Sequence, residues 1–211
     1  MREYTSADQS REKKPAFGPV VQNCYEWIEA LISAIIILVV VFTFFFRVVN
    51  VSGPSMLPTL ESNDRVLISM LFHKPQAGDV VVITRTQGLD QPIIKRILAT
   101  EGQTVDIDEQ SGDEYVDGEL LDESAYIENG ITTQPSDYTF PLTVPEGHVI
   151  QYPGRAYETI TLGEDEYFVL GDNRAVSNDS RSKDVGMVDE RYIMGKAEWI
   201  LFPFQRFGKI T

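Results

Sequence analysis

The sequence predicts a mainly β protein with an N-terminal transmembrane helix, an antiparallel β core and a smaller β lobe inserted into that core. Three observations predict this fold class. One uncharged apolar run occupies residues 30–46, short β-rich runs recur after it, and residues 97–154 differ in composition from their surroundings. With 211 residues, the chain is long enough to form one or two domains with a buried core.

The first element is the apolar run ALISAIIILVVVFTFFF at 30–46. Together with residues 27–29 and 48–51 it is long enough to cross a bilayer, and Tyr25 and Trp27 lie where interfacial aromatic residues are expected. A buried core helix is the alternative, but a globular domain rarely contains so long an uncharged run. No small-residue cleavage motif follows in FFFRVVNVSG, which favours an uncleaved anchor over a signal peptide.

Basic residues near the run predict its orientation. Four of them precede it and only Arg47 follows closely, so the positive-inside rule places the N-terminus in the cytoplasm. The four are Arg2, Arg11, Lys13 and Lys14. We therefore predict a single-pass protein of the cytoplasmic membrane, with a cytoplasmic tail at 1–26, an anchor at 27–49 and an extracytoplasmic domain.

The β core follows the anchor. Its runs are rich in Val, Ile and aromatic residues and are separated by Gly, Pro, Asp and Asn, with no long amphipathic helix pattern between them. This pattern is typical of a mainly antiparallel sheet, which we assign to residues 50–103 and 160–211. The last run is aromatic and either enters the membrane surface or forms an ordinary core strand. The runs are RVLISM at 65–70, DVVVIT at 79–84, PIIKRILA at 92–99, EYFVLG at 166–171 and KAEWILFPF at 196–204.

The inserted lobe, which we assign to 104–159, is marked by its acidity. Residues 97–154 contain 13 acidic residues and no Lys or Arg. A solvated, loop-rich insertion is one interpretation, and a calcium site or a partner-binding face is the other. Asp106 and Asp108 lack the spacing of an EF-hand loop.

Composition also excludes several classes of function. The net charge of −14 repels nucleic-acid phosphates, so we predict no nucleic-acid partner. Cys24 is the only cysteine, which excludes an internal disulfide. Only His73 and His148 accompany it, so a structural zinc site is hard to assemble.

A serine is held between two prolines in the stretch VSGPSMLPTL at 51–60. Pro54 and Pro58 restrict the backbone around Ser55, and Gly53 allows another backbone to approach closely. A linker leaving the anchor is the simple interpretation. The alternative is a nucleophile, which requires a base because a serine hydroxyl reacts poorly until its proton is removed.

Lys95 is the candidate base. Neither histidine has the surroundings of an oriented triad residue. Ser55 also does not begin a Ser-x-x-Lys motif, because no lysine stands three residues after it. In PIIKRIL read as a strand, Lys95 shares a face with Ile93 and Ile97, where burial would lower its pKa as a general base requires. The alternative is that Lys95 lies on a solvated face and Arg96 is buried instead.

A third polar stretch, GDNRAVSNDSR at 171–181, follows a β run. Its Asp, Asn, Arg and Ser residues are suited to hydrogen bonds with nearby backbone. A turn held by Asp179–Arg181 or Asp172–Arg96 ion pairs is one interpretation. A shell of residues that orients the candidate lysine is the other.

In this order behind an N-terminal anchor, the three stretches resemble bacterial type I signal peptidases. SGPSMLPTL is similar to the nucleophile box, IIKRILATEGQTV to the lysine box and GDNRAVSNDSR to the most specific signature, while GKAEWILFPFQRFG at 195–208 is similar to the C-terminal segment of Gram-positive members. The resemblance implies a partial-barrel core and a membrane-bound serine endopeptidase that removes signal peptides from exported preproteins. It implies no metal or cofactor, and its implied partners are preprotein signal peptides, the lipid bilayer and the secretion translocon.

The resemblance also implies roles for the site residues. Ser55 attacks the carbonyl, Lys95 accepts its proton, and Ser177 orients the lysine ammonium. Charged residues support the site, and the substrate binds as an added strand with small pockets for its residues −1 and −3. The supporting residues are Asp172, Arg96, Asp179 and Arg181, and the oxyanion and substrate-strand residues are Gly53, Pro54, Met56, Val51, Ile93 and Ile94.

The sequence departs from the family pattern in two places. Gly53 stands where enterobacterial members have a serine that donates to the oxyanion, so the oxyanion would depend on the Ser55 backbone N–H and one other donor. After the lysine, ATEGQ replaces the usual Gly-Leu-Pro-Gly-Asp and keeps only Gly102 of its glycines.

Two other functions remain open. A non-catalytic, peptidase-like assembly factor would hold a secreted partner in the same groove, although such relatives typically lack the serine or the lysine. A self-cleaving Ser–Lys protease of the repressor type would share related architecture. Such proteins bind DNA, against which the anchor and the acidic surface argue.

Overall fold

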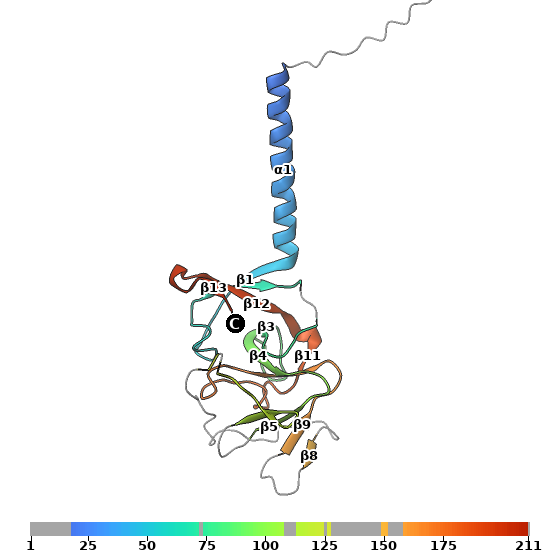
Figure 1. The fold of residues 1–211 in the computed structure, drawn as a ribbon, viewed down its shortest axis with the longest axis vertical. Helices are drawn as coiled ribbons and strands as arrows, with labels where there is room; N and C mark the ends of the chain where they lie inside the picture. The colour runs from blue at the N-terminus through green and yellow to red at the C-terminus, as the bar shows by residue number, and fades with distance from the viewer. Residues whose placement is uncertain are drawn as a thin grey trace, which may run out of the picture. The chain divides into compact units, whose positions relative to one another are not determined.

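The structure, a computed structural model, describes residues 18–71, 74–107, 113–124, 126–127, 149–151 and 158–210 (Figure 1). The chain divides into two compact units. The first extends to Phe42 and contains most of the single α-helix of the described residues, and the second begins at Thr43 and contains the strands. The second unit therefore carries every residue of the candidate site.

Helix α1 (Pro19–Phe45) contains the apolar run. Its segment Val21–Phe45 is long and apolar enough to cross a membrane, and no part of its most apolar window is buried by the rest of the protein. Ile and Val have only moderate helix propensity in water, but in lipid a helix pairs its backbone polar groups internally. Among the described residues, the window therefore lacks the packing that a buried core helix would have.

The large sheet is antiparallel and has the strand order β1-β2-β12-β3-β4-β10-β11, with β13 paired to β12. Side chains of β12 alternate between buried and more exposed positions, as expected of a strand that covers a core with one face. The strands are β1 (Phe46–Asn50), β2 (Arg65–Ser69), β3 (Val80–Ile83), β4 (Ile93–Ala99), β10 (Glu166–Leu170), β11 (Val188–Asp189), β12 (Ile193–Phe202) and β13 (Gly208–Lys209). The short 3-10 helices η1 (Glu190–Tyr192) and η2 (Phe204–Arg206) flank β12.

Strands β3 and β4 lie in the middle of this sheet and are covered on both faces. All four residues of β3 are buried, and so are the last five residues of β4. Val80 packs into one core cluster, while Val81 and Ile83 pack into a second on the opposite face. Side chains at the centre of β4 are therefore removed from water whichever way they point.

A second, smaller sheet is inserted between β4 and β10, with the order β7-β6-β5-β9-β8. Its inner residues, such as Val105 and Ile160, share a core cluster with Leu98 and Phe168 of the large sheet. The small lobe is thus packed onto the strand that carries the candidate base. Its strands are β5 (Thr104–Ile107), β6 (Glu114–Val116), β7 (Glu119–Leu120), β8 (Val149–Gln151) and β9 (Glu158–Thr161).

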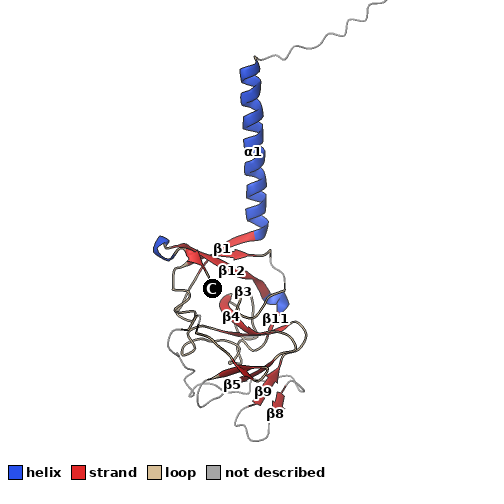
Figure 2. Ribbon diagram, in the orientation of Figure 1, coloured by secondary structure: helices blue, strands red, loops and turns tan. Residues whose placement is uncertain are grey.

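The architecture confirms the predicted fold class: one N-terminal apolar helix, a curled antiparallel sheet and a second small sheet (Figure 2). Each of the five β-rich runs contains or overlaps a strand. The sequence did not separate β1 from the anchor, which we assigned to 27–49, because Phe46–Asn50 continues the apolar run. Pairing with β2 makes these residues a strand instead.

Candidate active site

Ser55 lies in the segment that joins β1 to β2. The two ends of this segment are held together, because the Val51 N–H donates to the Asp64 carbonyl at 2.8 Å and the Asn63 N–H donates to the Val51 carbonyl at 2.9 Å. Met56 is buried in the core beside Val51, while Ser55 itself is half-buried. The core therefore fixes the residue that follows the serine and leaves the hydroxyl at its edge.

The backbone conformation at position 53 explains why glycine stands there. Its φ is +88°, in the left-handed region that favours glycine, and a Cβ added there would meet nothing within 4 Å. The space beside Gly53 is thus open on the side where a Cβ would lie. The side chains of Val51 and Met56 are buried, so only their backbone atoms could contact a substrate, whereas Pro54 is exposed.

Lys95 comes from the centre of β4 and is buried, with 3% of its surface exposed. Its Nζ donates to Ser55 Oγ at 3.0 Å and to the Ile94 carbonyl at 3.0 Å. Burial lowers the pKa of Lys95 to about 8; the carboxylates of Asp179 and Asp172 oppose this shift, and Arg181 adds to it. The alternative of a lysine on a solvated face is therefore excluded.

The pair can perform nucleophilic catalysis. At 3.0 Å the two heavy atoms are within the range in which a proton passes directly along a hydrogen bond. A lysine with a pKa near 8 is partly neutral at neutral pH, so its amine can accept the proton of the hydroxyl.

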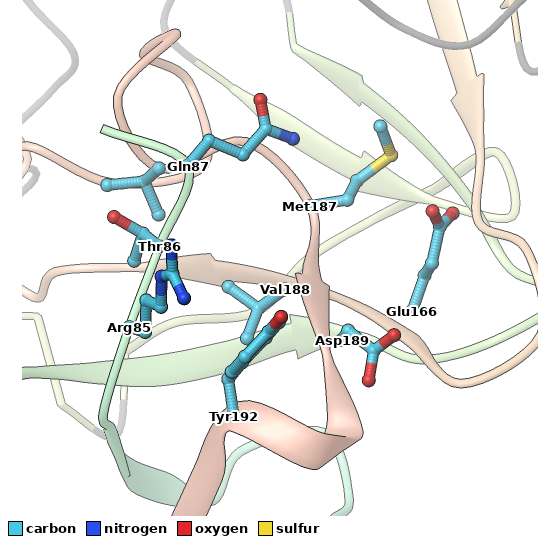
Figure 3. Close-up of a pocket in the computed structure, with 9 residues that line it drawn as sticks. Arg85, Thr86, Gln87, Glu166, Met187, Val188, Asp189 and Tyr192 are labelled. Carbon is cyan, nitrogen blue, oxygen red and sulfur yellow. The ribbon is translucent and has the colours of Figure 1, made fainter. Parts of the chain in front are cut away.

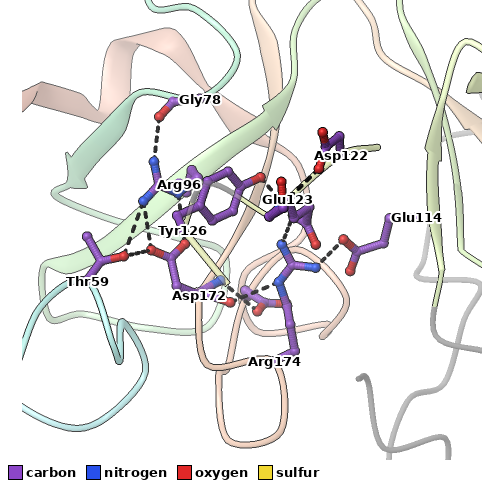
Figure 4. Close-up of polar contacts among 12 residues, drawn as sticks. Thr59, Gly78, Arg96, Glu114, Asp122, Glu123, Tyr126, Asp172 and Arg174 are labelled. Atoms are coloured by element: carbon purple, nitrogen blue, oxygen red, sulfur yellow. Dashed lines mark hydrogen bonds and ion pairs between the residues drawn. The ribbon is translucent and has the colours of Figure 1, made fainter. Parts of the chain in front are cut away.

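Arg96 and Asp172 form a buried, two-pronged ion pair (Figure 4). Arg96 Nε donates to Asp172 Oδ1 at 2.9 Å, and Nη2 donates to Oδ2 at 2.8 Å. The Thr59 hydroxyl also donates to this carboxylate, and Arg96 Nη1 donates to the Gly78 carbonyl at 2.9 Å. The structure brings this predicted pair together and connects it to the segment after Ser55.

Asp179 and Arg181 form the second buried pair. Arg181 Nε donates to Asp179 Oδ1 at 2.7 Å, and Nη2 donates to Oδ2 at 2.8 Å. Asp179 Oδ2 also accepts the Gly171 N–H at 3.1 Å. This pair therefore fixes the beginning of the turn that follows β10.

The turn at 171–174 lies against the segment that joins β1 to β2 and carries Ser55, which we call the nucleophile segment. The Asn173 N–H donates to the Ser55 carbonyl at 3.0 Å, and Asn173 Nδ2 donates to the Pro54 carbonyl at 3.2 Å. A Cβ added to Gly171 would lie 2.5 Å from the Ser55 carbonyl oxygen and 2.2 Å from Ser177 Oγ. No side chain fits at Gly171, so the turn can approach Ser55 this closely only with glycine there.

Ser177 is buried beside this contact, but it does not hydrogen-bond Lys95 in the structure. Its Oγ has no hydrogen-bond partner among the described residues, whereas the ammonium of Lys95 donates to Ser55 and to the Ile94 carbonyl. The role of Ser177 in orienting the lysine stays a prediction.

The two segments predicted to flank the substrate have open edges. β10 pairs with β4 only from Arg96 onward, so within the described chain Ile93 and Ile94 have a strand partner, β3, on one side only. β1 is the last strand of the sheet, and among the described strands it pairs only with β2. Both edges could pair with an extended peptide.

Sequence reasoning missed three residues that the structure places near Ser55 and Lys95. Thr59 contacts Asp172, Asn173 contacts the backbone of Ser55, and Arg174 joins the 171–174 turn to the inserted lobe. All three stand inside the quoted motifs. Only the structure shows which of their atoms meet, because the contacts join segments far apart in sequence.

Several sequence predictions lie outside the described residues or gain no support. His73, His148 and Asp108 lie outside the described residues. Among the residues that are described, no group of three His, Cys, Asp or Glu side chains could hold a metal ion. Asp106 is buried and accepts a hydrogen bond from the Thr159 hydroxyl.

A separate pocket of about 360 Å³ lies between the loop after β3 and strand β11 (Figure 3). Neither Ser55 nor Lys95 lines it. Its lining residues are Arg85, Thr86, Gln87, Glu166, Val185, Met187, Val188, Asp189 and Tyr192.

Comparison with known proteins gives concordant matches. The family model described as signal peptidase, peptidase S26 matches residues 24–202. The chain is 35% identical over 171 residues to the probable signal peptidase I-1 of Synechocystis sp. PCC 6803, covering 76% of this chain and 73% of that protein. It is 31% identical over 188 residues to signal peptidase IB of Staphylococcus aureus, covering 86% of this chain and 91% of that protein. A crystal structure of a signal peptidase I from Enterococcus faecalis V583 is 25% identical, with a TM-score of 0.39 over 59% of this chain and 97% of that chain.

Proposed function

This chain belongs to the bacterial type I signal peptidases of peptidase family S26, and we propose that it cleaves preproteins with a catalytic dyad of Ser55 and Lys95. As a family member it is a serine peptidase that removes signal peptides. The observation that carries the dyad is the 3.0 Å contact between Lys95 Nζ and Ser55 Oγ, made by a buried lysine whose pKa is lowered to about 8.

In the first half-reaction the neutral Lys95 amine accepts the Ser55 proton while Oγ attacks the carbonyl carbon of the last signal-peptide residue. The tetrahedral intermediate collapses when the Lys95 ammonium returns that proton to the leaving amine of the mature protein. In the second half-reaction Lys95 accepts a proton from water, whose oxygen attacks the acyl-enzyme. As this intermediate collapses, the Lys95 ammonium returns the proton to Ser55 Oγ, which restores the hydroxyl and the neutral amine. The released carboxylic acid of the signal peptide loses its proton to solvent.

The substrate is bound as a strand between the open edges of β1 and β4. Main-chain hydrogen bonds to residues 49–53 and 92–94 hold the peptide, and small pockets accept alanine-like residues at −1 and −3. The Ser55 backbone N–H stabilises the oxyanion. The conformation of Gly53 supports this arrangement, since it leaves open space next to the nucleophile segment.

Helix α1 anchors the enzyme in the cytoplasmic membrane, with the N-terminus in the cytoplasm and the catalytic unit outside. Only eight residues separate Arg47 from Ser55, which limits their separation to about 27–29 Å of extended chain. The nucleophile thus stays near the outer membrane surface, where preproteins emerge from the translocon. Exposed aromatic residues near the C-terminus, Trp199, Phe204 and Phe207, are suited to contact lipid headgroups.

Replacement of either dyad residue tests the proposal. Purified Ser55→Ala and Lys95→Ala variants in detergent micelles should bind a preprotein and leave it uncleaved, while Arg191→Lys, on an exposed pair, should cleave as the wild type does. Normal cleavage by either dyad variant would refute the mechanism. A wild-type protein that binds preprotein without ever cleaving it would favour the assembly-factor alternative.

A further inference from the structure

Arg174 lies at the centre of a buried cluster that joins the inserted lobe to the β core formed by the large sheet (Figure 4). One side of its guanidinium donates to Glu114 Oε2 of β6, and the other donates to Glu123 Oε1 in the segment after β7. Its Nε donates to the Gly171 carbonyl at 3.1 Å. Arg174 and Glu114 are each only 3% exposed, so water weakens these contacts little.

The far end of this connection is the nucleophile. Gly171 lies so near the Ser55 carbonyl oxygen that an added Cβ would be 2.5 Å from it, and the Asn173 N–H donates to that same oxygen at 3.0 Å. Arg174 follows directly and fixes the Gly171 carbonyl from the other side. A displacement of the 171–174 turn would therefore move Ser55 relative to Lys95.

A second connection runs parallel to the first. Tyr126, also in the lobe, lies with its ring 3.9 Å from the guanidinium carbon of Arg96, and its hydroxyl donates to Glu123 at 2.8 Å. Arg96 in turn holds Asp172, the neighbour of Gly171. Two cations of the β core, Arg96 and Arg174, thus contact the same short stretch of the lobe, which contains Glu123 and Tyr126.

We propose that Arg174 is a positioning residue through which Glu114 and Glu123 of the inserted lobe hold Ser55 in its reactive place. The proposal rests on the proposed function of Ser55 and Lys95. It gives the lobe a role in catalysis that needs no metal and no partner protein: the lobe supplies acceptors that keep the 171–174 turn pressed on the nucleophile.

The chemistry of the cluster favours arginine specifically. A planar guanidinium can donate in three directions at once, to two carboxylates and to one carbonyl, whereas a lysine ammonium acts as a point charge on a flexible stem. Burial raises the pKa of Glu114, so its protonated form is more accessible here than for an exposed glutamate. A glutamine at this position would resemble the protonated form.

Steady-state kinetics on a preprotein test the proposal. Arg174→Lys is expected to lower kcat about 10- to 100-fold while KM changes less than about threefold, because misplacement of a nucleophile by an ångström costs that much in rate. Glu114→Ala should lower kcat in the same way. Glu114→Gln should have a kcat about tenfold higher than that of Glu114→Ala, since its amide oxygen still accepts a hydrogen bond from Arg174. Arg191→Lys is the matched control, because Arg191 forms a comparable two-pronged pair with Asp189 on the exposed surface.

A second measurement separates positioning from folding and from the proposed function. Each variant, shown to be folded by its thermal melting curve, is treated with an activated phosphonate ester. Ser55 Oγ attacks its phosphorus, expels the activated alcohol and becomes phosphonylated, and the rate of this labelling is followed by mass spectrometry. Slower labelling in Arg174→Lys supports the proposal. The proposal is overturned if Arg174→Lys labels and turns over at the wild-type rate, or if Glu114→Ala and Glu114→Gln behave alike. Cleavage by Ser55→Ala would instead overturn the dyad itself.

Discussion

At the residue scale, the proposed chemistry depends on one buried amine. Lys95 is buried at the centre of β4, and desolvation by this burial is the largest cause of its lowered pKa. The nearby carboxylates Asp172 and Asp179 favour the charged form but are themselves neutralised by arginines. Burial therefore prevails, and the lysine becomes a base usable near neutral pH.

This depressed pKa predicts the pH dependence of the enzyme. The amine must be neutral to accept the Ser55 proton, so kcat should rise as pH increases through about 8. The neutral fraction grows from about a tenth at pH 7 to about nine tenths at pH 9, a rise in kcat of about tenfold. Saturating preprotein assays between pH 6 and 10 measure it. A flat profile over this range would remove Lys95 from the role of base.

Gly171 gives a second prediction at this scale. Alanine there would bring a Cβ within 2.5 Å of the Ser55 carbonyl oxygen, which is backbone and can give way only if the nucleophile segment moves. We expect Gly171→Ala to lose at least about tenfold in kcat while remaining folded. Gly208→Ala is the control, since its Cβ would meet no atom closer than 3.9 Å. Equal activity of the two variants would show that the turn is free to move.

The sequence alone could single out the candidate reactive residues, but it could not predict their contacts. Ser55 and Lys95 stood out because two prolines and a strand pattern constrained them. Which hydroxyl the lysine meets depends on the pairing of β3 with β4 and on the fold of the 51–64 segment, and neither is a local property. For the same reason it could not be foreseen that the buried hydroxyl of Ser177 would have no hydrogen-bond partner among the described residues.

At the scale of elements, β4 shows why the strand pattern left two interpretations open. Alternation predicted that either Lys95 or Arg96 would be buried, and the structure buries both. The reason is that both faces of β4 are covered. The inserted lobe packs on one face, and residues of the curled large sheet and its loops pack on the other, so neither face is solvated. Arg96 tolerates this because Asp172 pairs with it in two places.

The Arg96–Asp172 pair therefore predicts a change in stability. Arg96→Met leaves the carboxylate of Asp172 buried without its cation, which should lower the free energy of unfolding by about 3–5 kcal/mol. Arg191→Met removes a similar pair on the exposed surface, where solvent screens the charges, and should lower the free energy of unfolding far less. Urea unfolding followed by tryptophan fluorescence measures both changes. A loss of similar size in the two variants would mean that the buried pair contributes little to folding.

At the scale of the whole molecule, the sequence divides its surface between two environments. Residues 1–47 carry five basic and five acidic residues, so the later residues hold the entire net charge of −14. Helix α1 exposes apolar side chains, whereas the second unit buries its apolar residues in three clusters. Hydropathy predicted this division because it needs no long-range contact. The packing of the acidic lobe against the catalytic turn could not be predicted, since it depends on single charges meeting across the fold.

The orientation of the chain is the prediction on which catalysis in the cell depends, because signal peptides are cleaved where the preprotein emerges. With Cys24→Ala removing the only cysteine, new cysteines report each side: Glu164→Cys, on an exposed turn before β10, and Ser6→Cys, ahead of the apolar run. In right-side-out membrane vesicles, a membrane-impermeant maleimide should label Glu164→Cys directly and Ser6→Cys only after detergent is added. Both variants must still process a preprotein, which verifies that the labelled molecules are native. The opposite labelling would place Ser55 in the cytoplasm, and the exported preprotein would then never meet its nucleophile.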